Sequence, residues 1–569
     1  MPQGRRKVAF SGKAKKEQLK AKKQNKQGQN RKPLLVHQSD DEPSSSVQKV
    51  NYQPTKGNKT NPNRYALQFF KETNEEIKER KELARHSLQS VTEEELEVNG
   101  DDFFLKELDF PKRPPWSHDL SKQELEASEN KYFSEYLKNI EQQFSWKDLS
   151  FFELNLETWR QLWRVLEMSD IILFIVDIRF PALMFPPSLY NYVTTLKKDF
   201  ILVLNKIDLA PAPLVAAWKN YFQEKYPELH VVMFTTVPGY NLVGHQSDKG
   251  GLQLRRRKGR IRMAAEGTQQ LFDICNELVG DNVDLTSWKK KINDEIHEEY
   301  EDTDKVIVGE TIHVDPDTGY VNHERFHSGV LTLGCIGQPN VGKSSLMNAI
   351  MGKKVVSVSK TPGHTKHFQT IFLTENVKLC DCPGLIFPSK VPKQLQVLMG
   401  SYPIAQLREP FTTIKYLAER LDLPKLLRID NPDGDDQWSA MDICDGWAKK
   451  RGYLTAKAAR LDSYRAANSL LRMALDGKIC LCLRPPNFKE KKNFWNSHPD
   501  VEKVKWIQAR KEDDCVAELS QSDDNEEAKG DEDTNDTEGD DSQEESDESE
   551  EETVITSNSN KFSLLANMD

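Results

Sequence analysis

The segment with the most specific chemistry is 337–344, whose glycines, lysine and serine follow the spacing G-x-x-x-x-G-K-S. The apolar run 330–336 before it predicts a buried strand, and residues 345–350 after it predict the start of a helix. In such a turn the glycines let the backbone approach phosphate groups, and the amides join the positive end of the helix dipole. We expect Lys343 to bind the β- and γ-phosphates of a nucleotide and the Ser344 hydroxyl to bind Mg²⁺. The predicted phosphate-binding residues are Gly337, Gln338, Pro339, Asn340, Val341, Gly342, Lys343 and Ser344.

A second motif, N-K-x-D at 205–208, follows the apolar run 200–204, which predicts another buried strand. The carboxylate of Asp208 can accept hydrogen bonds from N1–H and from the 2-amino group of guanine, whereas adenine offers neither donor in that geometry. A polar site of this kind can prefer guanine to adenine by roughly 10⁴-fold. We expect Asn205 to contact the base edge and the stem of Lys206 to lie along the base face. The predicted base-binding residues are Asn205, Lys206, Ile207 and Asp208, with Thr235 and Thr236 as weaker candidates.

Two more segments could respond to the γ-phosphate. Thr365 lies in a stretch, 360–367, where a threonine can bind Mg²⁺ only while that phosphate is present, as in a switch I loop. Residues 381–384 form D-x-x-G after the predicted strand 377–380, so Asp381 could hold Mg²⁺ through water and the Gly384 amide could sense the phosphate. The predicted catalytic residues are Lys343, Thr365, Gly384 and Asn340; the predicted metal ligands are Ser344, Thr365 and Asp381; Cys382, Pro383 and Leu385 complete the expected nucleotide site.

These motifs occur in a rotated order along the chain: base recognition first, then the phosphate loop, switch I and switch II. Joining the ends of an ordinary G domain and opening it after switch II produces this order. We therefore predict an α/β fold, a circularly permuted P-loop G domain with a six-stranded, mostly parallel sheet and the nucleotide at its carboxyl edge. A smaller α-helical domain follows it, and the basic N-terminal and acidic C-terminal tails are predicted to be disordered.

The domain boundaries follow from shifts in composition and in hydrophobic pattern. The predicted parts are a basic arm and linker (1–62), a partly helical N-terminal extension (63–155), the G domain (156–391) with an insertion (240–325), an α-helical domain (392–500) and an acidic tail (501–569). The sequence leaves open whether the N-terminal extension docks on the core.

The motifs at 177–179, 205–208, 337–344, 361–365 and 381–385 resemble those of the circularly permuted GTPases of the YlqF/YawG group. Within that group, the stretches 157–170 and 355–388 resemble the eukaryotic guanine nucleotide-binding protein-like subfamily linked to the histocompatibility cluster. The resemblance covers about residues 60 to 500 and implies binding of GTP and GDP with Mg²⁺. It also implies K⁺ beside Asn340, the position at which similar K⁺-dependent GTPases help to hold that ion.

Together these features predict a GTP-hydrolysing molecular switch in biogenesis of the large ribosomal subunit, with ribosomal RNA or a pre-ribosomal particle as partner. The alternative is a nucleotide-binding signalling scaffold with negligible hydrolysis. Leu385 stands where many G proteins place a catalytic glutamine, so slow intrinsic turnover is expected. The oligomeric state is left open.

The net charge of −10 is the sum of a basic N-terminal end and an acidic C-terminal end. Residues 1–35 are dense in lysine and arginine and predict an RNA-binding arm, a nuclear or nucleolar address, or a solvated tail. The basic run 255–262 has two interpretations, RNA contact or a solvated loop. Residues 512–552 are almost entirely acidic or hydroxylated, and Ser522, Ser546 and Ser549 precede acidic residues, as kinase substrates do. We expect a nuclear or nucleolar protein that shuttles to the cytoplasm.

The eight cysteines lack the spacing of zinc ligands and are expected to be reduced core thiols in an intracellular protein. No apolar run has the length of a membrane span, so no membrane partner is expected.

The helical domain is predicted to contain helices at 394–398, 412–421, 440–450 and 456–475. The last carries Arg460, Arg465 and Arg472 beside a core face of Leu461, Tyr464, Leu470 and Leu471, which suggests either RNA contact or a structural buttress.

Overall fold

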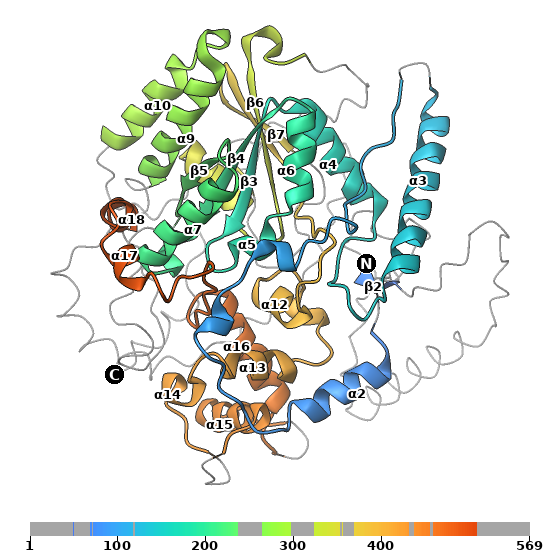
Figure 1. Cartoon of the computed structure of the whole chain (residues 1–569), viewed down its shortest axis with the longest axis vertical. Coiled ribbons are helices and arrows are strands. Elements are labelled where there is room, and N and C mark those ends of the chain that lie inside the picture. Colours follow the sequence, from blue (N-terminus) through green and yellow to red (C-terminus); the bar gives the residue numbers. More distant parts are fainter. Residues whose placement is uncertain are drawn as a thin grey trace, which may run out of the picture. The chain divides into compact units, whose positions relative to one another are not determined.

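The computed structural model describes residues 49–50, 69–70, 72–117, 120–236, 264–297, 324–352, 355–356, 369–431, 437–455 and 459–508. Six strands of this part of the chain form one sheet. Their order across the sheet is β5-β4-β3-β6-β8-β7 (Figure 1). The strands are β3 (Ile171–Asp177), β4 (Asp199–Asn205), β5 (His230–Met233), β6 (Leu331–Gly337), β7 (Gln369–Thr374) and β8 (Val377–Asp381). All neighbours are parallel except β7, which runs antiparallel to β8. The predicted six-stranded, mostly parallel sheet is confirmed.

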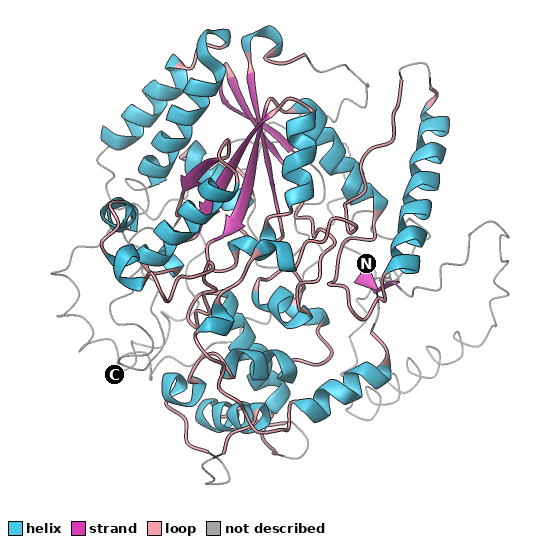
Figure 2. Ribbon diagram, in the orientation of Figure 1, coloured by secondary structure: helices cyan, strands magenta, loops and turns pink. Residues whose placement is uncertain are grey.

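The two central strands, β3 and β6, are buried along their whole length. Their unbroken apolar runs suit a parallel sheet that helices cover on both faces (Figure 2). The register pairs Ile175 with Gly337 and Asp177 with Asn205, so the carboxyl ends of neighbouring strands meet at one edge. The rotated motif order therefore still brings the base-recognition motif and the phosphate loop to the same edge of the sheet.

Among the described residues, helix α4 directly precedes β3 and six further helices lie in the segments that connect the strands of the sheet. They are α4 (Leu156–Met168), α5 (Pro181–Met184), α6 (Pro187–Thr195), α7 (Ala212–Lys225), α9 (Ala264–Val279), α10 (Thr286–His297) and α11 (Lys343–Met351). Trp159 and Trp163 of α4 are buried, as their spacing predicts. Short 3₁₀ turns occur at η3 (Ile207–Leu209), η4 (Gly280–Asn282) and η5 (His327–Gly329).

Part of the segment that we expected to be an insertion contributes to the core. Helix α9 packs against β5 and α11, and α10 packs against α9 and β7. Trp288 of α10 is fully buried and contacts Phe272 of α9 edge to face. These two helices are therefore part of the layer that covers the sheet, because their apolar faces need it as a partner. The basic run 255–262 lies outside the described residues.

A group of helices follows the sheet. They are α12 (Lys393–Leu398), α13 (Phe411–Ala418), α14 (Leu423–Leu427), α15 (Ala440–Arg451), α16 (Ser463–Leu475), α17 (Lys492–Asn496) and α18 (Asp500–Gln508), with a 3₁₀ turn η6 (Ile404–Gln406). Helix α16 starts at Ser463, later than predicted, because the Asp462 side chain caps its amino end. Tyr464 was wrongly predicted to be a core residue, since it is 44% exposed. Residues 501–508, assigned to the acidic tail from the sequence, belong instead to α18.

The N-terminal extension docks on the rest of the chain. Its elements are β2 (Phe69–Phe70), α2 (Asn74–Leu83), η1 (Glu94–Leu96), η2 (Gly100–Asp102) and α3 (Lys122–Gln143), and β2 pairs with β1 (Lys49–Val50) of the preceding linker. The backbone amides of Ser150 and Glu153 donate to the carbonyls of Ser389 and Ile386, at 3.0 and 3.2 Å. The buried Gln396 amide also bonds both backbone groups of Phe151, at 2.8 and 2.7 Å. The segment after the D-x-x-G motif is thus covered by residues that precede the sheet.

The cysteines in the described part of the chain are free thiols, and most are buried, as predicted. None of the described helices combines the length and apolar character needed to cross a membrane.

Candidate functional site

The predicted phosphate loop connects the end of β6 to the start of α11. Asn340 and Gly342 adopt left-handed backbone conformations, with φ of 59° and 97°, so the chain reverses tightly before the helix. A Cβ at Gly342 would lie 2.5 Å from Nδ2 of Asn205, which shows how closely the base-recognition motif approaches the loop. The Lys343 ammonium donates to the carbonyls of Gly337 and Gln338, at 3.0 and 2.8 Å. Burial lowers the pKa of Lys343.

The D-x-x-G motif begins at the end of β8, next to this loop. The Ser344 hydroxyl donates to Oδ2 of Asp381 at 3.1 Å. The other carboxylate oxygen of Asp381 is buried and has no hydrogen-bond partner among the described residues. Burial raises the pKa of this carboxyl to about 6. An unpaired carboxylate oxygen beside a hydroxyl is the kind of hard oxygen donor set that Mg²⁺ takes, so these two residues fit the metal predicted for this position.

The backbone after Asp381 follows the phosphate loop closely. The amide of Cys382 donates to the carbonyl of Cys335 at 3.1 Å, and that of Leu385 to the carbonyl of Gly337 at 3.2 Å. A Cβ at Gly384 would lie 2.8 Å from the Cα of Pro339. Only glycine fits at this position without displacing the loop. Pro383 and the residues on either side of it are buried.

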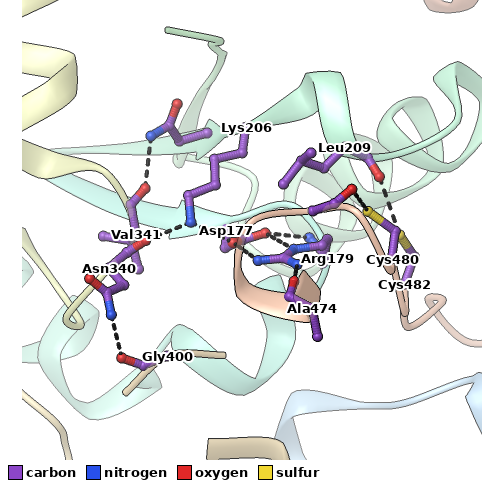
Figure 3. A network of polar contacts seen from close by, with 12 residues as sticks. Asp177, Arg179, Lys206, Leu209, Asn340, Val341, Gly400, Ala474, Cys480 and Cys482 are labelled. Atoms are coloured by element: carbon purple, nitrogen blue, oxygen red, sulfur yellow. Dashed lines mark hydrogen bonds and ion pairs between the residues drawn. The ribbon is translucent and has the colours of Figure 1, made fainter. Parts of the chain in front are cut away.

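The N-K-x-D motif begins at the last residue of β4 and contacts the phosphate loop directly. Asn205 Nδ2 donates to the carbonyl of Val341 at 2.8 Å, and Lys206 Nζ donates to the carbonyl of Asn340 at 2.6 Å (Figure 3). The Oδ1 atom of Asn205 is buried and unpartnered within the described chain. Lys206 has a left-handed backbone, which turns the chain into the 3₁₀ segment that carries Asp208. Two motifs separated by more than a hundred residues therefore form one continuous site.

Asp208 and Ile207 are buried below the surface of this site. The Thr235 hydroxyl donates to Oδ1 of Asp208 at 2.7 Å, which fixes the orientation of the carboxylate. The Thr235 side chain thus contacts the predicted base-recognition residue, whereas the sequence suggested a backbone contact with the base. Thr365 lies outside the described residues, as does the rest of the predicted switch I stretch.

Sequence reasoning did not assign a role to the ion pair of Asp177 and Arg179, which lies behind the site. Oδ2 of Asp177 accepts hydrogen bonds from Arg179 Nη2 and from Lys206 Nζ, both at 2.9 Å, and Oδ1 accepts from Arg179 Nε at 3.1 Å. Burial alone raises the pKa of Asp177, but the guanidinium and the ammonium hold it well below its ordinary value. Because Arg179 also donates to the carbonyl of Ala474, the pair connects the site to helix α16 (Figure 3). The only sequence signal was a charged D-x-R directly after a wholly apolar strand.

Two side chains of the phosphate loop contact the segment that follows α12. Asn340 Nδ2 donates to the carbonyl of Gly400 at 2.9 Å. The Ser401 hydroxyl donates to Oε1 of Gln338 at 2.6 Å, and both side chains are buried. The sequence gave no sign of these two contacts, because residues 400 and 401 lie in an ordinary glycine-serine turn.

Comparison with known proteins is consistent with this arrangement. Residues 332–421 match a family model described as a 50S ribosome-binding GTPase. The chain is similar to guanine nucleotide-binding protein-like 1 of Mus musculus and of Homo sapiens, each 49% identical over 487 residues, which is 82% of this chain and 80% of the relative. It is 34% identical to large subunit GTPase 1 of Schizosaccharomyces pombe over 411 residues, 68% of this chain and 60% of that one. GNP-bound YlqF from T. maritima aligns with 57% of this chain and 97% of its own, at 18% identity and a TM-score of 0.33. The identity and coverage of the first relatives show that the chain belongs to the guanine nucleotide-binding protein-like 1 family of circularly permuted GTPases.

Proposed function

We propose that the chain is a GTP-hydrolysing switch that acts in assembly of the large ribosomal subunit. The observation that carries the proposal is the contact of Lys206 with the carbonyl of Asn340 at 2.6 Å. It joins a guanine-recognition motif to a phosphate loop at the carboxyl edge of a parallel sheet, where nucleotides bind in folds of this class. Asn205 supports the same junction through Val341.

Guanine selectivity is assigned to Asp208. Its carboxylate, oriented by Thr235, accepts from N1–H and from the 2-amino group of the base. Adenine would leave this buried carboxylate without its partners, which is strongly unfavourable. Asn205 contacts the base edge, and the Lys206 stem covers the base face.

The phosphates are assigned to the loop amides and to Lys343, which moves from the carbonyls of Gly337 and Gln338 to the β- and γ-phosphates. Ser344 would hold Mg²⁺ directly and Asp381 through water, and Thr365 would join these ligands while GTP is bound. When bound, the metal supplies positive charge to the phosphate oxygens. Leu385 is fully buried where other G proteins place a glutamine, so the chain orients the attacking water poorly and its intrinsic turnover is slow.

The cellular role rests on the names of the family model and of one relative, a 50S ribosome-binding GTPase and a large subunit GTPase. Ribosomal RNA or a pre-ribosomal particle is the proposed partner. The basic arm supports binding to such a polyanion and a nucleolar location with cytoplasmic shuttling.

Nucleotide titration of the purified full-length protein tests the binding step. GTP and GDP should bind far more tightly than ATP, and Asp208→Ala should remove the preference. Asp208→Asn should shift the preference toward xanthosine triphosphate, because its amide can donate to the 2-oxo group that xanthine has in place of the 2-amino group. The exposed Asp281→Ala serves as a matched control. Equal affinity of the unmodified protein for GTP and ATP would overturn the proposal.

A signalling scaffold with negligible hydrolysis is the second candidate, and the buried Leu385 favours it. Sedimentation of cell lysate with and without a non-hydrolysable GTP analogue separates the two. Nucleotide-dependent migration with large-subunit precursors supports the assembly role, and its absence supports the scaffold.

A further inference from the structure

The 3₁₀ turn that carries Asp208 is held from behind by the C-terminal part of the described chain. Gln508 Nε2 donates to the carbonyls of Ile207 and Ala210, at 2.6 and 2.9 Å. The thiol of Cys482 donates to the carbonyl of Leu209 at 3.6 Å. Three carbonyl acceptors in and directly after this turn are thus bound by residues 273 to 301 positions later in the sequence.

Gln508 is the last residue of α18, and that helix is firmly placed. Its Val501, Val504 and Ile507 are buried, and it packs on α7 and on the 3₁₀ turn (Figure 1). An ion pair between Lys219 of α7 and Asp500, at 2.7 Å, fixes its other end. The Gln508 side chain is 1% exposed. Both hydrogen bonds that the structure shows for this buried side chain therefore go to the turn that carries Asp208.

The chemistry of the amide explains why glutamine suits this position. Both partners are carbonyl oxygens, so the nitrogen must face them, and its two hydrogens match two acceptors. A glutamine also reaches farther from the helix axis than an asparagine by one methylene group. Without these donors, two buried carbonyls would lose their partners, and the turn would shift to recover hydrogen bonds.

We propose that Gln508 is a positioning residue for guanine selectivity, which acts through Ile207 and Ala210 to align the carboxylate of Asp208 with the base. This inference rests on the proposed binding of guanine nucleotides. It makes the C-terminal helix, rather than the G domain alone, a determinant of which base is accepted. Gln508 does not touch the nucleotide, and its effect is limited to the geometry of the turn.

Comparison of GTP with inosine triphosphate isolates that geometry. Inosine keeps N1–H and lacks the 2-amino group, so only guanine benefits from a carboxylate aligned for two hydrogen bonds. In the full-length protein, Gln508→Leu removes both donors and Gln508→Asn withdraws them by one methylene. Val504→Ala, which leaves a cavity at a fully buried position of the same helix, is the matched control for general loss of packing.

Affinities for both nucleotides, the GDP dissociation rate and the thermal midpoint are measured for each variant. Gln508→Leu should weaken GTP binding about tenfold, the loss expected from roughly one to two net hydrogen bonds, and should weaken inosine triphosphate much less. Gln508→Asn should weaken GTP binding in the same way but by a smaller factor. Because asparagine keeps the amide group, this variant still tests the inference if Gln508→Leu does not fold.

The control should lower the thermal midpoint without changing the ratio of GTP to inosine triphosphate affinity. If both Gln508 variants also kept that ratio, Gln508 would be a structural residue and the inference would be overturned. If the unmodified protein did not prefer GTP to ATP, the proposed function itself would fail, so the two failures are distinguishable.

Discussion

The guanidinium of Arg179 donates a hydrogen bond to the carbonyl oxygen of Ala474 at 2.7 Å, across 295 residues of sequence. Arg179 lies just beyond β3, and Ala474 lies in the last turn of α16, where the negative end of the helix dipole attracts a cation. The same guanidinium forms a two-point contact with Asp177, which also binds Lys206. The N-K-x-D motif is therefore connected to the helices that follow the sheet through the buried Asp177–Arg179 pair.

Arg179→Met should destabilise the protein strongly, because it leaves the Asp177 carboxylate buried with Lys206 as its remaining cation. Breaking a buried pair on one side lowers the free energy of unfolding by about 3–5 kcal/mol. Urea unfolding measures the effect. Arg472→Met, on the exposed face of α16, removes the same side chain from the surface and should change stability by less than about 0.5 kcal/mol. Similar losses for both variants would contradict the assignment.

Gly342→Ala should weaken nucleotide binding strongly while it affects the stability of the fold only moderately. The added methyl group would push Nδ2 of Asn205 away from the phosphate loop. Gly452→Ala is the control, because it has a similar left-handed φ and no atom within 4 Å of the new methyl group. Both variants should lose about 1–2 kcal/mol from backbone strain. Calorimetric titration with GDP should show that only Gly342→Ala binds weakly.

The stability of the protein in EDTA, without nucleotide, should decrease as pH rises from about 4 to 7. Burial raises the pKa of Asp381 from 3.8 to about 6 in the folded state, so the folded protein holds this proton more tightly than the unfolded chain. The corresponding stabilisation is complete below about pH 4 and is lost as pH rises through 6, a change of roughly 3 kcal/mol. Asp381→Asn should flatten that part of the profile in urea unfolding. An unchanged slope would show that this carboxyl does not cause it.

Hydrogen exchange in residues 393–407 should differ between the GDP form and the form with a GTP analogue. Lys343 donates to the carbonyl of Gln338, and the Gln338 side chain accepts from Ser401, so these contacts form a path from the phosphate loop to the segment after α12. A γ-phosphate that binds Lys343 would remove the first contact of this path. Ser401→Ala should reduce the difference. Ser469→Ala, whose hydroxyl contacts Trp447 instead, should not. Identical protection in both nucleotide states would exclude the path.

GTP hydrolysis should be faster in K⁺ than in Na⁺. The Asn340 amide nitrogen donates to Gly400, which leaves the amide oxygen as the atom that a cation could bind. Asn340→Ala should remove the difference between the two salts, and its thermal midpoint should be checked because the Gly400 contact is also lost. Equal rates for the unmodified protein would remove Asn340 from the mechanism.

The sequence predicted the sheet well because four of its six strands end in a motif residue: β3 at Asp177, β4 at Asn205, β6 at Gly337 and β8 at Asp381. The motifs also identified most of the residues that converge. The start of α16 was missed because Asp462, a capping residue, interrupts a pattern that looked helical from 456 onward. Helix α18 was missed because Glu502, Lys503 and Lys505 hide the one apolar face of a short segment.

Contacts between distant segments could not be predicted in the same way. Nothing local distinguishes Gln508 or Ser401 from other polar residues, and their partners lie 301 and 63 positions away. Only the packing of α18 on α7, and of the turn after α12 on the phosphate loop, brings them to the site. The domain boundaries and the role of Thr365 stay predictions.

The position of β6 beside β3 has a consequence for biosynthesis. Strands β3, β4 and β5, which include the N-K-x-D motif, leave the ribosome first, and β3 has one unpaired edge until Leu331–Gly337 has been synthesised. During that interval the nascent chain presents an apolar, unpaired strand edge, a surface prone to aggregation. Translation of this protein therefore passes through a stage in which a chaperone has a defined place to bind.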